Sequence, residues 1–297
     1  MPGLKAQPTA GVYCRSMTRT AVLVAAAALL FAAADPVPRF EVDPLWPKPL
    51  PNHWILGSVT GVAVDTRDHV WLVHLGMESL TAKTEAGLGT NPPTAETCCT
   101  PAPPVLEFDP SGNLVGHWGG PGAGFEWPKA PAGIDVDREG NVSIRGDGQV
   151  LKFTRMGTFV AQIPVESPPV PAATCVRPAK DGIVYVCDRK NKRVQAMKDG
   201  RPLKEAVVTI GADPVWDIAL SADPQQRFIY VADGNDQTVW VLRRDTLVVV
   251  SHIGSPGRYP GLFYGVGSIA VDSKGNLYTG ETFEGKRLQK FIYKGTR

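Results

Sequence analysis

The chain is predicted to be an all-β protein, because turn-forming residues and short β-rich runs dominate its 297 residues. It contains 31 glycines and 27 prolines, which are typical of turns between many short strands rather than of long helices. Hydrophobic residues make up 43% of the sequence and charged residues 20%. This composition fits a globular protein and excludes a disordered or collagen-like one.

One strand–turn–strand phrase recurs five times. Each copy is a β-rich run, a polar turn containing Asp, Gly or Asn, and a second β-rich run, which indicates a hairpin. The copies begin at Gly61, Gly133, Cys175, Asp217 and Ser268. The steps between equivalent turn residues (Asp65, Asp137, Ala179, Ser221, Asp272) are 72, 42, 42 and 51 residues. A period near 42 is typical of a four-stranded blade, so the sequence predicts a β-propeller with five visible blades.

Further runs supply the outer strands of these blades. Segments that begin at Val105, Val150 and Val239 alternate apolar and polar residues about a central turn, as third and fourth strands should. The long first step contains a Pro- and Thr-rich stretch, residues 79–104, which we expect to be a loop insertion. The final unit has a strand from Leu288 but lacks a fourth. We expect the segment from Arg39 to provide that strand and to tie the two termini together.

Residues 1–34 are predicted to be a signal peptide. Fourteen apolar residues run from Ala21 to Ala34 after Arg19, and small residues precede Asp35. The run is too short to span a bilayer, which makes a membrane anchor the weaker interpretation. Met17 is an alternative start. The mature chain, residues 35–297, is then a single propeller domain that is secreted or periplasmic.

The charge balance argues against a nucleic-acid-binding protein. The whole chain has 31 basic and 29 acidic residues, but residues 1–34 hold three basic residues and no acid, which leaves 28 against 29. A dedicated nucleic-acid binder would carry a strong basic excess. The sequence also contains no Gly-rich phosphate loop that opens a helix and no Gly-x-Ser-x-Gly elbow.

Four stretches carry a resemblance to a known family. They read WPKPLPNHWILGSVTGVAVD from Trp46, NPPTAETCCTPAPPVLEFDPSGNL from Asn91, YVCDRKNKRVQ, and DPQQRFIYVADG. The chain resembles bacterial NHL-repeat proteins similar to the peptidyl-hydroxyglycine α-amidating lyase domain over most of residues 40–295. The resemblance implies six blades. Only residues 164–174 lie where the family carries its additional blade, so a ring of five, a ring of six and an incomplete ring remain open.

The resemblance also implies a zinc ion held by histidines just before three inner strands, with a catalytic Arg and Tyr. The equivalent positions here, expected to line the central channel, are Thr60, Ala132, Thr174, Trp216 and Gly267. None of these side chains is a zinc ligand. The position of the family's catalytic Arg is occupied here by Leu75, which follows His74. The family's catalytic Tyr belongs to the blade that is absent from this sequence. We therefore expect no metal or other cofactor and no lyase activity.

Other candidate site residues stand near the expected channel. His74 ends a strand beside a long loop; a ligand contact is one hypothesis, but a partly exposed structural imidazole is favoured. Asp217 follows Trp216 and could face water or a calcium ion. Arg177 lies on an inner strand, where a charge needs a partner. An ion pair with Asp217 or Asp188 is favoured over contact with an anionic ligand.

The remaining features are assigned mainly to structure. Asp65, Asp137 and Asp272 recur at hairpin turns, where a carboxylate accepts backbone N–H bonds. The basic run at residues 189–193 is favoured as a solvated turn over an anion-binding patch. Cys175 and Cys187 are symmetric about a turn and within disulfide reach, which leaves a bond or two buried thiols open. Vicinal Cys98 and Cys99 are not expected to bond to each other.

The sequence predicts an exported binding or scaffold module, without catalysis of its own, for a protein, peptide or carbohydrate held on a propeller face. Nucleic acid is not an expected partner, and the mature chain has no predicted membrane span. The alternative is an enzyme: an amidating-lyase-like or lactonase-like protein that uses zinc or calcium held by residues not identified above.

Overall fold

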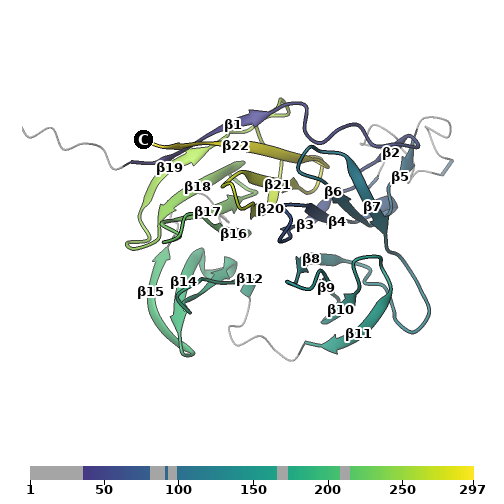
Figure 1. The fold of residues 1–297 in the computed structure, drawn as a ribbon, viewed down its shortest axis with the longest axis horizontal. Helices are drawn as coiled ribbons and strands as arrows, with labels where there is room; N and C mark the ends of the chain where they lie inside the picture. The colour runs from purple at the N-terminus through teal and green to yellow at the C-terminus, as the bar shows by residue number, and fades with distance from the viewer. Residues whose placement is uncertain (1–35, 81–90, 93–98, 166–172, 208–214) are drawn as a thin grey trace, which may run out of the picture. The chain divides into compact units, whose positions relative to one another are not determined.

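The fold is described from a computed structural model, for residues 36–80, 91–92, 99–165, 173–207 and 215–297. The described residues form five four-stranded antiparallel sheets around a common centre, one small two-stranded sheet and two short 3-10 helices (Figure 1). The prediction of a five-bladed β-propeller is therefore confirmed. No described helix is long and apolar enough to cross a bilayer. The predicted signal peptide lies outside the described residues and stays a prediction.

Each blade runs from an inner strand at the centre to an outer strand at the rim (Figure 1). Blade 1 consists of β3 (Val59–Val64), β4 (Val70–His74), β6 (Val105–Phe108) and β7 (Leu114–Trp118). Blade 2 consists of β8 (Pro131–Val136), β9 (Val142–Gly146), β10 (Gln149–Phe153) and β11 (Phe159–Pro164). Blade 3 consists of β12 (Ala173–Pro178), β13 (Val184–Asp188), β14 (Arg193–Lys198) and β15 (Arg201–Val207).

Blade 4 consists of β16 (Asp217–Leu220), β17 (Phe228–Asp233), β18 (Thr238–Arg243) and β19 (Val249–Ile253). Blade 5 consists of β20 (Val266–Val271), β21 (Leu277–Glu281), β22 (Leu288–Thr296) and β1 (Pro38–Asp43). The two-stranded sheet pairs β2 (Trp54–Ile55) with β5 (Thr100–Pro101), and the helices are η1 (Gly76–Ser79) and η2 (Arg189–Asn191).

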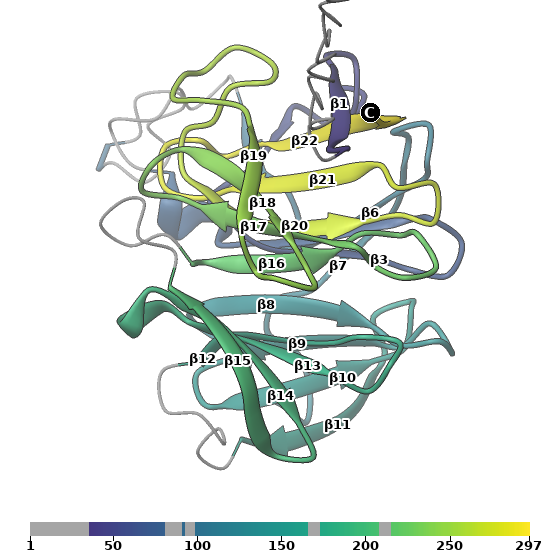
Figure 2. The same ribbon diagram turned by 90° about the vertical axis from the view of Figure 1, so that its left-hand side faces the viewer.

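The N-terminal strand completes the last blade, as expected. Strand β1 pairs antiparallel with β22, with Glu41 opposite Ile292 and Asp43 opposite Lys290, and Figure 2 shows β21, β22 and β1 in succession. Phe40 on β1 packs edge-on against Tyr230 of blade 4, with ring centroids 5.5 Å apart. The closing strand thus holds its own sheet and the neighbouring blade together.

The turn carboxylates act as the sequence predicts. Asp272 Oδ1 accepts the Asn276 N–H at 2.8 Å, and Asp137 Oδ1 accepts the Asn141 N–H at 2.7 Å. Asp65 Oδ1 accepts the His69 N–H at 3.0 Å. Each bond fixes the turn between an inner strand and its neighbour. The recurrence of Asp at this place therefore reflects turn geometry.

Apolar side chains fill four of the boundaries between blades. Separate clusters of buried residues join blades 5 and 1, 1 and 2, 3 and 4, and 4 and 5. The inner strands approach closely where glycine allows it: a Cβ on Gly61 of β3 would lie 2.8 Å from the backbone nitrogen of Ile134 on β8. Such an approach excludes any larger residue at position 61.

The boundary between blades 2 and 3 differs from the other four. Among the described residues, no cluster of buried apolar side chains spans it. Val176 on inner strand β12 remains 43% exposed. An Arg145 Nη atom of blade 2 donates to the Thr174 carbonyl of blade 3 at 3.3 Å. A polar contact therefore bridges the two blades at this boundary.

Deleting residues 35–50 should lower the melting temperature by about 10 °C or more, because the deletion removes β1 and Trp46 from their contacts. Trp46 is 5% exposed and packs on Phe108 and Tyr278, between blades 1 and 5. Thermal unfolding followed by circular dichroism measures the effect. A chain that begins at Asp35 is the control. An unchanged melting temperature would show that β1 does not hold the ring.

Candidate functional site

The five inner-strand positions singled out in the sequence meet around one central cavity. Its lining includes one residue from the start of each blade: Thr60, Ala132, Thr174, Trp216 and Gly267. The cavity has a volume of only about 30 Å³. That volume admits one or two water molecules, not an organic substrate.

Two arginines occupy much of the channel. Arg145 donates to the carbonyl oxygens of Ala132 and Thr174, both at 3.3 Å. Arg177 extends from β12 and donates through Nε to the Ile218 carbonyl at 3.2 Å. Arg145 was not singled out from the sequence. A single basic residue in the short strand β9 was the available signal.

Arg177, which is partly exposed, and the buried Asp217 form an ion pair across the boundary between blades 3 and 4. Their closest atoms, Arg177 Nη2 and Asp217 Oδ1, lie 2.7 Å apart. Asp217 is 6% exposed and also accepts the Ile269 N–H at 3.2 Å. Burial raises the pKa of Asp217, while the charge of Arg177 opposes that shift. The other partner considered for Arg177, Asp188, binds Arg193 instead.

The cavity offers few groups that bind metal. Of the described residues that line it, Asp135 and Asp217 carry carboxylates. Asp217 already binds a guanidinium and a backbone amide. Calcium needs six to eight oxygen ligands and zinc usually needs four donors. The donor set therefore does not fit either ion without displacement of Arg177.

An aromatic cluster lies beside the channel, and we call Trp216, Phe283 and Arg189 the aromatic mouth. The rings of Trp216 and Phe283 meet edge-on with centroids 5.6 Å apart. The Arg189 guanidinium carbon lies 3.9 Å from the centre of a Trp216 ring. Phe283 is 60% exposed. The expectation that the basic run is simply solvated is wrong for Arg189, because its guanidinium stacks on indole.

His74 is a buried structural histidine. It is 1% exposed, so the expectation of a partly exposed imidazole is wrong. Its Nδ1 accepts the N–H groups of Gly57 and Gly76, and its Nε2 lies 3.0 Å from the Pro103 carbonyl oxygen. These contacts require a neutral ring with the proton on Nε2. Burial lowers the pKa of His74 to about 4. Both nitrogens are used within the protein, which leaves neither for a ligand.

The cysteines of blade 3 are bonded. Cys175 and Cys187 stand opposite each other on β12 and β13, form a disulfide and have Cα atoms 4.9 Å apart. Both are almost fully buried in the core between blades 3 and 4. Cys99 also takes part in a disulfide. Cys98 lies outside the described residues.

A second polar cluster lies between blades 1 and 2. One atom each of Asp65, His69 and Glu107 lie within 4.8 Å of one another. Glu107 is 2% exposed and accepts from His69 Nδ1 at 2.7 Å and from Arg67 at 3.1 Å; it also pairs with Arg155. The two guanidinium groups balance the two carboxylates, so a metal ion would have to displace them. The sequence spacing gave no sign that Glu107 joins His69.

Replacing Arg177 with Met should cost about 3 to 5 kcal/mol of unfolding free energy, because Asp217 would stay buried without its partner. Changing both residues, Arg177→Met with Asp217→Leu, should recover much of that loss. Chemical denaturation measures both effects. The control is Arg243→Met, which breaks the more exposed pair with Asp245 and should cost at most about 1 kcal/mol. The unfolding free energy of Asp217→Leu alone is measured as well. If the double variant loses as much unfolding free energy as the two single variants together, the coupling between Arg177 and Asp217 is contradicted.

Acid should destabilise the protein through His74. Its native pKa of about 4 lies below the ordinary histidine pKa of about 6.5, so the unfolded chain binds the proton first as the pH falls. The stabilisation that neutral His74 gives the folded state is complete above pH 6.5. It is lost as the pH falls towards 4, and the total loss of unfolding free energy is about 3 kcal/mol. Unfolding free energies of the wild type and of His74→Asn across this range test it. The unfolding free energy of the wild type minus that of His74→Asn should grow with pH. A difference that stays constant would refute the assignment of His74 as a buried neutral histidine.

The comparisons with known proteins do not name a family. No protein-family model matches the sequence, and no curated protein matches it. Solved structures with some likeness include glutaminyl cyclase of Myxococcus xanthus, with 12% identity, a TM-score of 0.46, and coverage of 87% of this chain and 97% of that one. Virginiamycin B lyase of Staphylococcus aureus has 12% identity and a TM-score of 0.34, over 86% and 74% of the two chains. At these values the likeness carries no functional argument.

Proposed function

We propose that the protein is an exported binding or scaffold module that recognises a protein, peptide or carbohydrate at the aromatic mouth. Export rests on the signal-like residues 1–34. The five-bladed ring supplies a rigid support on which loops can present contact residues. The resemblance to NHL-repeat proteins agrees with a propeller that serves recognition.

The exposed aromatic mouth is the observation that carries this proposal. Phe283 presents 60% of its surface, although its ring packs on Trp216. An exposed aromatic side chain fixed by a neighbour is a low-entropy contact for a sugar face or an apolar peptide side chain. The adjacent Arg189 adds a positive charge. The narrow channel behind these residues favours binding at the surface over binding inside it.

The alternative function is a metal-dependent lyase or hydrolase of the amidating-lyase type. The sequence resemblance favours it. The donor set of the channel does not support it, since the positions that correspond to the family histidines are Ala132, Thr174 and Gly267. An enzyme of this kind would therefore have to gather its metal ligands elsewhere.

Binding at the aromatic mouth can be tested with arrays of oligosaccharides and synthetic peptides. We expect the wild-type protein to bind one class and Phe283→Ala to weaken that binding about tenfold, as for loss of a fixed aromatic contact. Met156→Ala is a matched control, because Met156 is 82% exposed on the β10–β11 turn of blade 2. Equal binding by Phe283→Ala, or no binding to either array, would count against the proposal.

The enzyme alternative has its own assay. A peptide with a C-terminal α-hydroxyglycine is incubated with the protein and zinc, and glyoxylate is measured. We expect no release above that of zinc alone. Catalytic release of glyoxylate would overturn the proposal of a non-catalytic module.

A further inference from the structure

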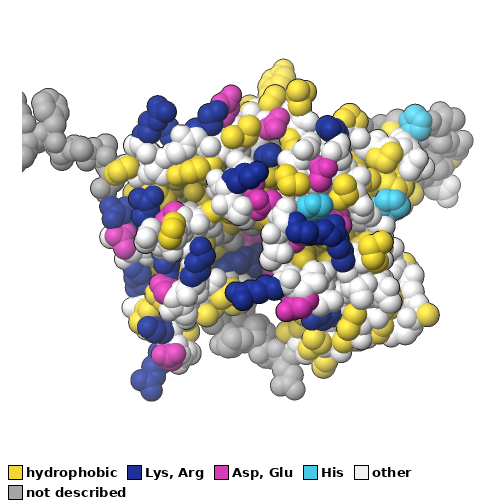
Figure 3. Space-filling model, in the orientation of Figure 1, with side chains coloured by type: hydrophobic (Ala, Val, Ile, Leu, Met, Phe, Trp, Pro, Cys, Tyr) yellow, Lys and Arg dark blue, Asp and Glu magenta, His cyan; other side chains and the backbone are white. Residues whose placement is uncertain are grey.

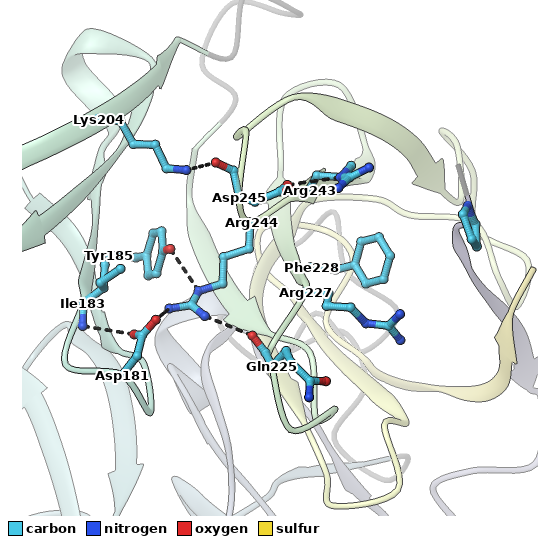
Figure 4. Close-up of a pocket in the computed structure, with 11 residues that line it drawn as sticks. Asp181, Ile183, Tyr185, Lys204, Gln225, Arg227, Phe228, Arg243, Arg244 and Asp245 are labelled. Carbon is cyan, nitrogen blue, oxygen red and sulfur yellow. Dashed lines mark hydrogen bonds and ion pairs between the residues drawn. The ribbon is translucent and has the colours of Figure 1, made fainter. Parts of the chain in front are cut away.

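A second cavity, separate from the central channel, lies where turns of blades 3 and 4 meet (Figure 4). Its volume is about 440 Å³, which is within the range of small-molecule sites. Asp181 lies in the β12–β13 turn, Gln225 in the β16–β17 turn and Asp245 in the β18–β19 turn. We call this cavity the turn cleft. Neither the proposed function nor the sequence patterns account for it.

Arg244 forms the fixed centre of the turn cleft. Its side chain is 12% exposed and pairs with Asp181 at 2.5 Å. It also donates to the Tyr185 hydroxyl and to the Gln225 carbonyl, both at 3.0 Å. The hydrogen bond from Arg244 holds the pKa of Asp181 below its usual value. A guanidinium with three partners from two blades is pre-organised, so a ligand would not have to order it.

Two cationic groups with spare hydrogen-bond donors flank this centre. Arg227 is 54% exposed and uses its Nε to bind Asp223 at 3.2 Å; its two Nη atoms have no hydrogen-bond partner among the described residues. Lys204 donates one bond to the Asp245 carbonyl, which leaves the ammonium group capacity for two more. Figure 4 places Lys204 and Tyr185 to one side of Arg244, and Arg227 and Phe228 to the other.

The charge of the turn cleft is positive. Its lining contains four basic residues, Lys204, Arg227, Arg243 and Arg244, and two acidic ones, Asp181 and Asp245. The formal surplus is therefore two positive charges. Figure 3 shows that Lys and Arg side chains are also frequent on the surface over blades 3 and 4, on the left. Tyr185 and Phe228 behind the charges are 1% and 5% exposed, and such apolar walls strengthen electrostatic attraction.

We propose that the turn cleft binds a small organic dianion with two separated oxyanion groups, such as a dicarboxylate. One group binds at Lys204 and the other at the Nη atoms of Arg227, with Arg244 between them. The positive surplus of the lining, reduced by Asp223 beside Arg227, attracts an anion. Planar guanidinium groups are suited to carboxylate and phosphate oxygens. A phosphorylated metabolite shares this oxyanion chemistry.

Calorimetric titration tests the proposal with succinate, glutarate and glycerol 2-phosphate as probes. Acetate at equal ionic strength is the control for a single charge. We expect saturable binding of at least one dicarboxylate, at least tenfold tighter than acetate. Tighter binding of the phosphate ester than of both dicarboxylates would identify a phosphorylated ligand.

Two conservative changes remove the spare donors without breaking the clamp made by Arg244. Lys204→Gln and Arg227→Gln should each weaken dicarboxylate binding about tenfold, the loss expected for one charge-assisted hydrogen bond. Lys129→Gln and Arg138→Gln are matched controls on exposed positions near blade 2. Binding by the controls should stay within twofold of wild type. Absence of saturable dianion binding, or an equal loss in the controls, would overturn the proposal.

Discussion

The fold depends on burial of apolar side chains between neighbouring sheets. A four-stranded sheet has two faces, and a ring covers both by packing each blade on the next. Clusters of buried residues fill four boundaries here. Strand β1 adds a hydrogen-bonded closure, because pairing with β22 places the N-terminal and C-terminal segments in one sheet. A ring assembled in this way resists opening at the blade that contains both ends.

Packing of five inner strands around one axis also sets the chemistry of the centre. Where the inner strands begin, the cavity between them holds only a water molecule or two, and a wider cavity of about 240 Å³ lies among the ends of the same five strands. Side chains from one blade reach the next. Arg177 and Asp217 illustrate this, since they belong to different blades and neutralise each other inside the channel. Space for a larger ligand lies at the aromatic mouth, in the turn cleft and among the ends of the inner strands.

Local patterns in the sequence were sufficient for the blade architecture and for contacts within a hairpin. The repeated turn aspartates located the hairpins, the unpaired strand at Leu288 pointed to the N-terminal segment, and symmetry about a turn brought Cys175 opposite Cys187. The family resemblance implied six blades, and residues 164–174 were the sign that one is absent. The repeat period shows where the strands fall along the chain, and these predictions concern only the strands and the turns that join them.

Contacts between blades were harder to predict, because they depend on which turns meet across a boundary. Burial of His74 goes with the contacts of its ring with Gly57, Gly76 and Pro103, and an isolated strand-end histidine carries no sign of them in the sequence. Arg244 meets Asp181 across 63 residues of sequence. Glu107 on β6 of blade 1 likewise pairs with Arg155 from the β10–β11 turn of blade 2. The spacing of residues along one sequence does not show which of them will meet in space.

The central claim is that apolar packing between blades holds the ring, with the boundary between blades 2 and 3 as its weakest part. Hydrogen–deuterium exchange resolved by peptide tests it most directly. We expect the inner strands β8 and β12 to exchange faster than β3 and β20, because buried apolar contacts raise the free energy of local opening. Equal protection of these four inner strands would contradict the claim.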